Sequence, residues 1–453
     1  MKYQGRHRHL LLKAGTFLAV VFAAVSVSYT QSGSSAIASQ KASVTEFEVN
    51  GLKVLVRNRE NAKTVSGGLF IRGGARNITA ATAGIERLTL QAAIEAGKGY
   101  SRDVLRREIA ETGSALGAGV SNDYGVLNFA TTSADFDRTW KVFSDVVLNP
   151  TFVASDVERV RELILTGIRN REDDADSYLN ALQERLIYAN HPYANDVSGT
   201  EESISSFKPS QLAAYHKSIL QTSKLLLVIV GNVDPRTVEL AVTESFGKLP
   251  VGDYKEKNYP KLDFSKPTLE VAPRVLPTNY IKGVFKAPSI GDEDYYPMQV
   301  AVTILRNRLF EEVRQKRQLS YAPSASLDNF AVNTANIYVT AIDANRTMTV
   351  MLDEIKRLRR ELVREYDIES VAGGFLTSYF IDQETNAAQA VSLAQFELFG
   401  GGWANSFDFL DKIRSVTPGD VRAVSQKYIK NLRFVVVGNP AAVEKSVFLQ
   451  ELN

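Results

Sequence analysis

The sequence predicts an α+β protein built from two copies of one domain, and three observations support this fold class. One helix–strand pattern occurs twice, with the copies about 208 residues apart. Strands and helices lack the regular alternation of a doubly wound nucleotide-binding fold. The chain also contains no Walker loop or other phosphate-binding glycine motif. Its run of three glycines, Gly400, Gly401 and Gly402, falls between predicted helices and is expected to be a turn.

The repeated pattern is an amphipathic helix followed by an apolar strand that ends in Gly-Asn. It comprises Lys208-Pro209, residues 225–230 and Gly231-Asn232 in the first copy, and Thr417-Pro418, residues 434–437 and Gly438-Asn439 in the second. Proline is tolerated at the first helical position, where its missing N–H costs nothing, and threonine is a good N-cap. A repeat of this length indicates duplicated domains and not a solenoid.

The other elements follow in chain order from periodicity and end signals. In the first half, we expect strands at 53–57, 66–72 and 124–131 and helices at 101–112 and 155–169. Gly113 is expected to end the first of these helices, and Ser155 with Glu158 forms a capping-box pattern at the start of the second. In the second half, we expect helices at 295–313 and 345–362 and strands around Ala325 and Ile337.

The polar, aperiodic segment 251–266 is the predicted linker between the two domains. It separates an N-terminal domain at residues 42–250 from a C-terminal domain at residues 267–453.

The first 38 residues have the character of an export signal peptide. They carry a basic start, an apolar run at 16–27 and small residues before a cleavage point, at Lys2, Arg6, Arg8, Lys13, Ala36 and Ala38. The apolar run is shorter than the ~20 residues that span a bilayer, which favours cleavage over a retained membrane anchor. We therefore expect a mature protein outside the membrane, in the periplasm or outside the cell.

Composition excludes several functions. The net charge of +2 includes four cations in residues 1–38, so the rest of the chain stands at −2 and lacks the basic surface of a nucleic-acid binder. Cysteine is absent, which excludes thiol catalysis and disulfides. Only His191 and His216 lie beyond residue 38, and we expect both to be structural, with His216 on a half-buried helix face.

Four groups of residues occur in an order and at a spacing that resemble a known family. They are Gly73-Gly74-Ala75-Arg76 with Ala83-Gly84-Ile85; Asn149-Pro150-Thr151-Phe152; His191-Pro192-Tyr193 with Gly199-Thr200-Glu201-Glu202-Ser203-Ile204; and residues 308–317 with Leu319-Ser320-Tyr321. From about Thr45 onward, the chain resembles the M16 zinc peptidases, the relatives of pitrilysin, insulinase and the processing peptidases. The resemblance implies two similar α+β domains that form a half-clamshell, which agrees with the duplication.

The zinc site of that family is where this sequence departs from it. The resemblance implies two histidines at i and i+4 of a helix, a glutamate base beside the second, and a glutamate ligand downstream. Here Arg87 and Gln91 stand at the histidine positions, Leu90 at the base and Gly167 at the third ligand. A guanidinium stays protonated and cannot ligate zinc. We therefore expect no cofactor, no metal site and no catalytic residue in this chain.

The C-terminal signature of the family is retained. In active members an Arg and a Tyr of this segment hold the substrate backbone and help to stabilise the oxyanion, and here they are Arg314 and Tyr321. The alternative is that Arg314 pairs with Glu311 while Tyr321 packs in the core. Residues 117–121 align with the family's substrate edge, to which a peptide adds as a strand.

Some members of the family are heterodimers in which one subunit carries zinc and the other completes the chamber. The resemblance therefore implies a non-catalytic, substrate-binding subunit that faces a zinc-bearing paralogue and binds extended peptides. A stand-alone peptide-binding or structural scaffold is the first alternative. A hydrolase with an unrelated site is the second, although no serine elbow or histidine triad context is present. A calcium site is a further alternative to a solvated helix end at Glu172, Asp173, Asp174 and Asp176.

Overall fold

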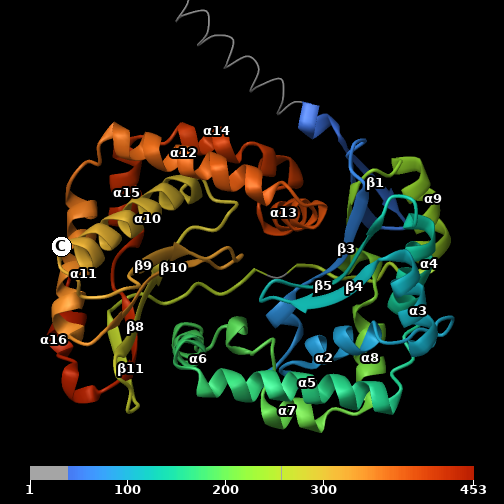
Figure 1. The fold of residues 1–453 in the computed structure, drawn as a ribbon, viewed down its shortest axis with the longest axis horizontal. Helices are drawn as coiled ribbons and strands as arrows, with labels where there is room; N and C mark the ends of the chain where they lie inside the picture. The colour runs from blue at the N-terminus through green and yellow to red at the C-terminus, as the bar shows by residue number, and fades with distance from the viewer. Residues whose placement is uncertain (1–38, 257, 453) are drawn as a thin grey trace, which may run out of the picture.

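The fold consists of two halves, each a sheet covered by helices (Figure 1). A computed structural model describes residues 39–256 and 258–452. The predicted signal peptide, residues 1–38, lies outside the described residues. The first half lies on the right of Figure 1 and the second half on the left.

The first sheet has the strand order β1-β2-β6-β3-β5-β4. Only β2 and β6 pair in parallel, and the other neighbours are antiparallel. The central strand β6 is buried at every position, as expected for an apolar strand covered on both faces. The strands are β1 (Val44–Val49), β2 (Leu52–Asn58), β3 (Thr64–Arg72), β4 (Ala115–Val120), β5 (Tyr124–Thr132) and β6 (Leu225–Gly231).

The helices of the first half include the three predicted from the sequence, which are α3, α5 and α8. The helices of this half are α2 (Ile85–Ala93), α3 (Arg102–Thr112), α4 (Phe136–Leu148), α5 (Ala154–Asp173), α6 (Ala175–Ile187), α7 (Glu201–Ser206), α8 (Pro209–Ile219) and α9 (Pro235–Ser245). Gly113 ends α3 with φ 61°, a left-handed conformation that glycine adopts without strain. The predicted capping box at Ser155 is wrong, because α5 begins one residue earlier and its N-cap is Val153, which has no capping side chain.

The second sheet has the strand order β7-β11-β8-β10-β9, with β7 and β11 parallel. Its strands are β7 (Thr268–Pro273), β8 (Asn279–Lys286), β9 (Ser324–Leu327), β10 (Thr334–Ala341) and β11 (Arg433–Gly438). Its helices are α10 (Tyr295–Leu309), α11 (Ala344–Arg360), α12 (Glu365–Asp382), α13 (Asn386–Phe399), α14 (Phe409–Arg414), α15 (Pro418–Tyr428) and α16 (Lys445–Phe448). Among the helices that the structure describes, none is both long and apolar enough to cross a membrane.

The two halves share one topology. The first sheet without β1 has the order β2-β6-β3-β5-β4, which matches β7-β11-β8-β10-β9 strand for strand and includes one parallel pair in the same place. The predicted helix–strand repeat corresponds to α8 with β6 and to α15 with β11. By the same correspondence, α2, α5 and α6 match α10, α12 and α13. The predicted α+β fold and its duplication are confirmed.

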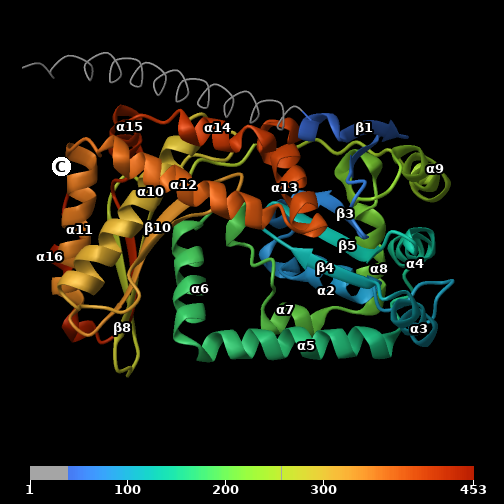
Figure 2. The ribbon, with the colours of Figure 1, turned by 45° about the horizontal axis from the view of Figure 1, so that its top comes forward.

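Each half sends a helix onto the sheet of the other half. In Figures 1 and 2, α5 leads to α6, which lies beside the second sheet, while α12 leads to α13, which lies on the first. Leu393 and Ala394 of α13 pack with Phe70 and Val228 of the first sheet, and Leu182 of α6 packs with strand β11. Burying a side chain as large as Leu393 contributes about 1.5–3 kcal/mol. The exchanged helices therefore join the halves through their cores.

Residues 251–256 and 258–266, the described part of the predicted linker, contain no helix or strand. They nevertheless pack against both halves, because Tyr259 and Leu262 lie in an apolar cluster with Tyr193 of the first half and Val284 of the second.

Candidate functional site

Helix α2 carries three of the four positions that correspond to the family's zinc site. It packs between α5, α8 and strand β4, so its faces meet different surroundings. Arg87 and Gln91 are half-buried one turn apart, whereas Leu90 is fully buried in the core beneath the sheet. Gly167 lies on the exposed face of α5, where an added Cβ would meet no atom within 4 Å.

Arg87 is held by the segment that follows the His-Pro-Tyr turn. Its Nη1 donates to the Ser198 carbonyl at 3.4 Å. Burial lowers the pKa of Arg87, and the nearby Arg171 adds to this effect, while Asp196 opposes it. Asp196 also pairs with Arg171 at 2.8 Å. A cation that donates to a backbone carbonyl therefore stands at the first ligand position.

Glu86, the neighbour of Arg87, is a buried carboxyl group that the sequence analysis did not single out. Its Oε2 accepts hydrogen bonds from the Tyr215 hydroxyl at 2.5 Å and from Asn77 Nδ2 at 3.2 Å. Its Oε1 is buried without a hydrogen-bond partner among the described residues. Burial raises the pKa of Glu86, against the hydrogen bonds from Tyr215 and Asn77 and the charge of Lys224.

The residues at the zinc positions do not fit zinc. A tetrahedral site needs several nitrogen, sulfur or carboxylate ligands that converge on one point. The four positions provide a guanidinium, an apolar side chain in the core, a neutral amide and an exposed glycine. Within the described part of the chain, no group of three or more His, Cys, Asp or Glu side chains is placed to hold a metal ion.

The two histidines lie in separate buried places. The Nδ1 of His191 accepts from the Tyr193 amide at 3.1 Å, and the ring stacks on Tyr259. The Nε2 of His216 donates to the Val147 carbonyl at 2.9 Å. Each residue is 5% exposed, so His216 is more deeply buried than the half-buried position predicted for it. Burial lowers the pKa of each to about 4, so both rings are neutral near pH 7.

Arg314 and Tyr321 lie in direct contact on the surface of the second half. The guanidinium carbon of Arg314 is 3.9 Å from the centre of the Tyr321 ring and 4.9 Å from that of Phe310. Glu311 pairs with Lys316 at 2.8 Å. Tyr321 is 77% exposed, so it does not pack in the core as the alternative required.

The local backbone explains how this pair forms. Helix α10 was predicted to run to residue 313, but it ends at Leu309 and continues as a π-helix from Phe310 to Lys316. The chain then turns through Gln318 in the left-handed conformation, with φ 52°. This turn returns Tyr321 over Arg314. Short π-helical segments are frequent at functional sites.

Strand β4 forms a free edge of the first sheet. It pairs only with β5, and every residue of β4 is at least partly exposed. The segment that aligns with the family's substrate edge, residues 117–121, covers most of this strand. An extended peptide could pair with its unbonded backbone groups.

Comparison with known proteins reveals the family. The model described as "Insulinase (Peptidase family M16)" matches residues 53–201, and the one described as "Peptidase M16 inactive domain" matches residues 206–373. The chain belongs to peptidase family M16.

M16 relatives span nearly the whole chain. An uncharacterized zinc protease of Mycobacterium leprae is 22% identical over 408 residues, covering 88% of this chain and 92% of the relative. The beta subunit of the mitochondrial-processing peptidase of Lentinula edodes is 21% identical, covering 86% of this chain and 88% of the relative.

Solved structures share the fold. The crystal structure of a peptidase M16 inactive domain from Pseudomonas fluorescens has a TM-score of 0.79 at 20% identity, covering 88% of this chain and 99% of that one. A protease from Helicobacter pylori has a TM-score of 0.78 at 16% identity, covering 87% and 99%.

The two halves of this M16 chain are joined at a second buried carboxylate, Asp123, in the turn between β4 and β5. It is 4% exposed and accepts hydrogen bonds from the hydroxyls of Tyr193 and Tyr259 and, at 2.9 Å, from the Ala331 amide of the second half. Burial raises the pKa of Asp123, while its three donors and Arg76 oppose the shift. In sequence, only the aromatic residues near 193 and 259 hint at this network.

As pH rises, the free energy of unfolding of the Glu86→Gln variant is expected to exceed that of the wild-type M16 chain. The pKa of Glu86 is raised above the ~4.3 of an unfolded chain. The contribution of Glu86 to the free energy of unfolding is therefore complete below the pKa of the unfolded chain. It is lost as pH rises through the pKa of Glu86 in the folded state. Glutamine stays uncharged throughout. Urea unfolding between about pH 4 and pH 8 measures the difference.

The matched control is Glu244→Gln, at an exposed position on α9. Its effect on the free energy of unfolding should not change in this way over the same pH range. A constant difference between Glu86→Gln and the wild type would contradict the assignment of a raised pKa to Glu86.

Proposed function

We propose that this chain is a non-catalytic, substrate-binding subunit of a heterodimeric M16 zinc peptidase. Its partner would be a zinc-bearing paralogue, and its substrates would be extended peptides. The proposal places the mature chain in the periplasm or outside the cell, after removal of the signal peptide predicted at residues 1–38.

The observation that carries this proposal is the Arg314–Tyr321 contact on the surface of the second half, in a chain whose zinc positions on the first half have lost their ligands. Tyr321 is 77% exposed and the centre of its ring lies 3.9 Å from the guanidinium carbon of half-buried Arg314, so both groups can be reached from solvent. A cation and a phenol together suit the carbonyl oxygen of a peptide, where negative charge develops during hydrolysis. The metal chemistry would come from the partner.

The free edge of β4 supports the same function. Backbone pairing at a sheet edge binds peptides with little dependence on their sequence. A subunit of this kind would therefore contribute affinity and orientation.

The test is cleavage of quenched, unstructured peptides by the purified chain, by the zinc-bearing paralogue, and by the two together, each with and without a chelator. We expect no turnover by the chain alone and chelator-sensitive turnover by the mixture that exceeds that of the paralogue. Chelator-sensitive turnover by the chain alone would refute the proposal. An absence of any gain on mixing would leave the stand-alone scaffold as the better reading.

Within that mixture, Arg314→Ala is expected to lower turnover by about 100-fold, which is the usual effect of removing one donor to a developing oxyanion. The matched control is Arg360→Ala, which removes the same charge at an exposed position at the end of α11. Equal effects of the two substitutions would show that overall charge, and not the Arg314–Tyr321 pair, governs turnover. Co-purification of the two subunits checks that assembly is intact.

A further inference from the structure

We infer that the cavity between α10, α12 and α13 is a binding site for a small, uncharged saccharide. The cavity has a volume of about 580 Å³. This size lies within the range of about 300–1,000 Å³ that is typical of small-molecule sites. The site involves neither Arg314, Tyr321 nor the β4 edge, so it stands independently of the proposed function.

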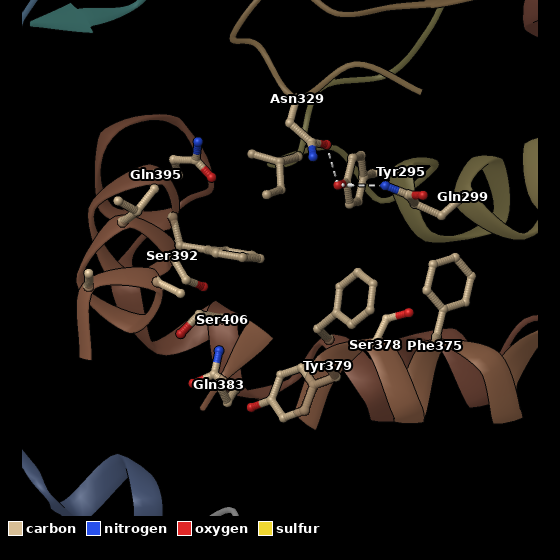
Figure 3. A pocket seen from close by; sticks show the side chains of 16 residues that line it. Tyr295, Gln299, Asn329, Phe375, Ser378, Tyr379, Gln383, Ser392, Gln395 and Ser406 are labelled. Atoms are coloured by element: carbon tan, nitrogen blue, oxygen red, sulfur yellow. Dashed lines mark hydrogen bonds between the residues drawn. The ribbon is translucent and has the colours of Figure 1, made fainter. Parts of the chain in front are cut away.

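The wall of the cavity is mostly apolar, and the polar groups that it carries are uncharged. None of the described residues that line it is Asp, Glu, Lys, Arg or His. Figure 3 shows amide and hydroxyl groups around the space, with aromatic rings between them. A charged ligand would lose hydration on entering this cavity without gaining an ion pair.

Several of these polar groups have unused hydrogen-bonding capacity. The hydroxyls of Ser378 and Ser392 have no hydrogen-bond partner among the described residues, and the same is true of Asn329 Nδ2 and Gln395 Oε1. They provide donors and acceptors on different walls, since the residues lie on α12, α13 and the segment before β10. A ligand whose hydroxyls both donate and accept matches this set.

The amide of Asn329 is fixed in place. Its Oδ1 accepts from the Tyr295 hydroxyl at 2.6 Å, and that hydroxyl accepts in turn from Gln299 Nε2 at 2.8 Å (Figure 3). Tyr295 is only 2% exposed, so the chain of hydrogen bonds is anchored in the core. Because Oδ1 is engaged, Nδ2 is the group left to meet a ligand. An ordered donor of this kind binds with little loss of conformational entropy.

The helical walls favour a saccharide over a peptide. The backbone groups of α10, α12 and α13 are bonded within the helices, so a peptide would find no strand edge to pair with. A sugar ring needs only side-chain amides and hydroxyls at its edge and an apolar surface at its face. Rings such as Phe375 and Tyr379 provide that surface.

The cavity in the second half occupies the place that corresponds to the altered zinc site in the first half. This follows because helices α10, α12 and α13 correspond to α2, α5 and α6. Gln395 also donates to the Tyr124 hydroxyl of the first sheet, at 3.4 Å. One wall of the cavity is therefore attached to the other half of the molecule.

The test is isothermal titration of the purified chain with cellobiose, maltose and di-N-acetylchitobiose, beside a neutral blocked tripeptide and a glucuronic-acid disaccharide. We expect at least one neutral disaccharide to bind and the other two probes to fail. Ser378→Phe, at an exposed position on α12, should block the cavity and weaken binding by roughly tenfold or more. Asn329→Leu, which removes the free amide donor, should also weaken it.

The matched control is Thr377→Phe, the neighbouring exposed position, which does not line the cavity and should leave binding unchanged. Absence of binding by all three neutral disaccharides would overturn the inference. So would preferential binding of the tripeptide, or equal affinity of the wild type and the Ser378→Phe variant.

Discussion

Replacing Leu90 with glutamate is expected to destabilise the fold by about 3 kcal/mol or more, although glutamate is the residue that an active M16 site needs there. Leu90 is fully buried and packs with Leu127 and Phe143 in the core beneath the first sheet. The substitution removes apolar contacts and places a carboxyl group where no donor awaits it. Urea unfolding followed by circular dichroism measures the loss.

The neighbouring substitution Gln91→Glu is the control. Gln91 is half-buried on the same helix, so its replacement should cost less than about 1 kcal/mol. If both variants were equally stable, Leu90 could not be an integral part of the core. The expected contrast would show that the position of the catalytic base has been filled by core packing, so that restoring a glutamate there would weaken the fold.

Replacing Asp123 with alanine is expected to destabilise the protein by about 3 kcal/mol or more, because each buried donor left without an acceptor costs about 1–3 kcal/mol. The substitution leaves two tyrosine hydroxyls and the Ala331 amide without their acceptor. Because these donors come from both halves and from the segment between them, unfolding should also become less cooperative. Urea unfolding monitored by two independent probes tests both expectations.

Asp137→Ala, at an exposed position on α4, is the control and should change stability by less than about 0.5 kcal/mol. Asp123→Asn should lie between the two, since an amide oxygen can still accept from the donors. A single sharp transition at wild-type stability in Asp123→Ala would show that the network contributes nothing to joining the halves.

Local signals in the sequence predicted much of the fold. Helix α8 and strand β6 follow from a proline near the helix start and an apolar run that ends in Gly-Asn, and the second copy follows from the same pattern. Other elements were missed, among them strands β1, β7 and β8 and helices α4, α6, α9, α12 and α13. Helix α12 shows little separation of apolar and polar faces, because apolar residues such as Phe380 and Ile381 are exposed while others pack on α10 and α14. Periodicity cannot identify an element of that kind.

The candidate functional residues also divide into those that the sequence predicted and those that it did not. The altered zinc positions and Arg314 and Tyr321 were found because a family pattern marks them, whereas the roles of the last two remain a prediction. Glu86, Asp123 and the cavity beside α13 carry no such pattern. Each depends on residues far apart in the chain, such as Glu86 and Tyr215 or Asp123 and Ala331, which only the folded structure brings together.

The exchange of α6 and α13 determines how variants of this protein should be interpreted. A substitution at Leu393 lies in the C-terminal half of the sequence but weakens the core of the first sheet, and one at Leu182 weakens the second. Position along the chain is therefore a poor guide to which half a change will damage. Because each half completes its core with a helix encoded in the other, we expect the two domains to unfold together.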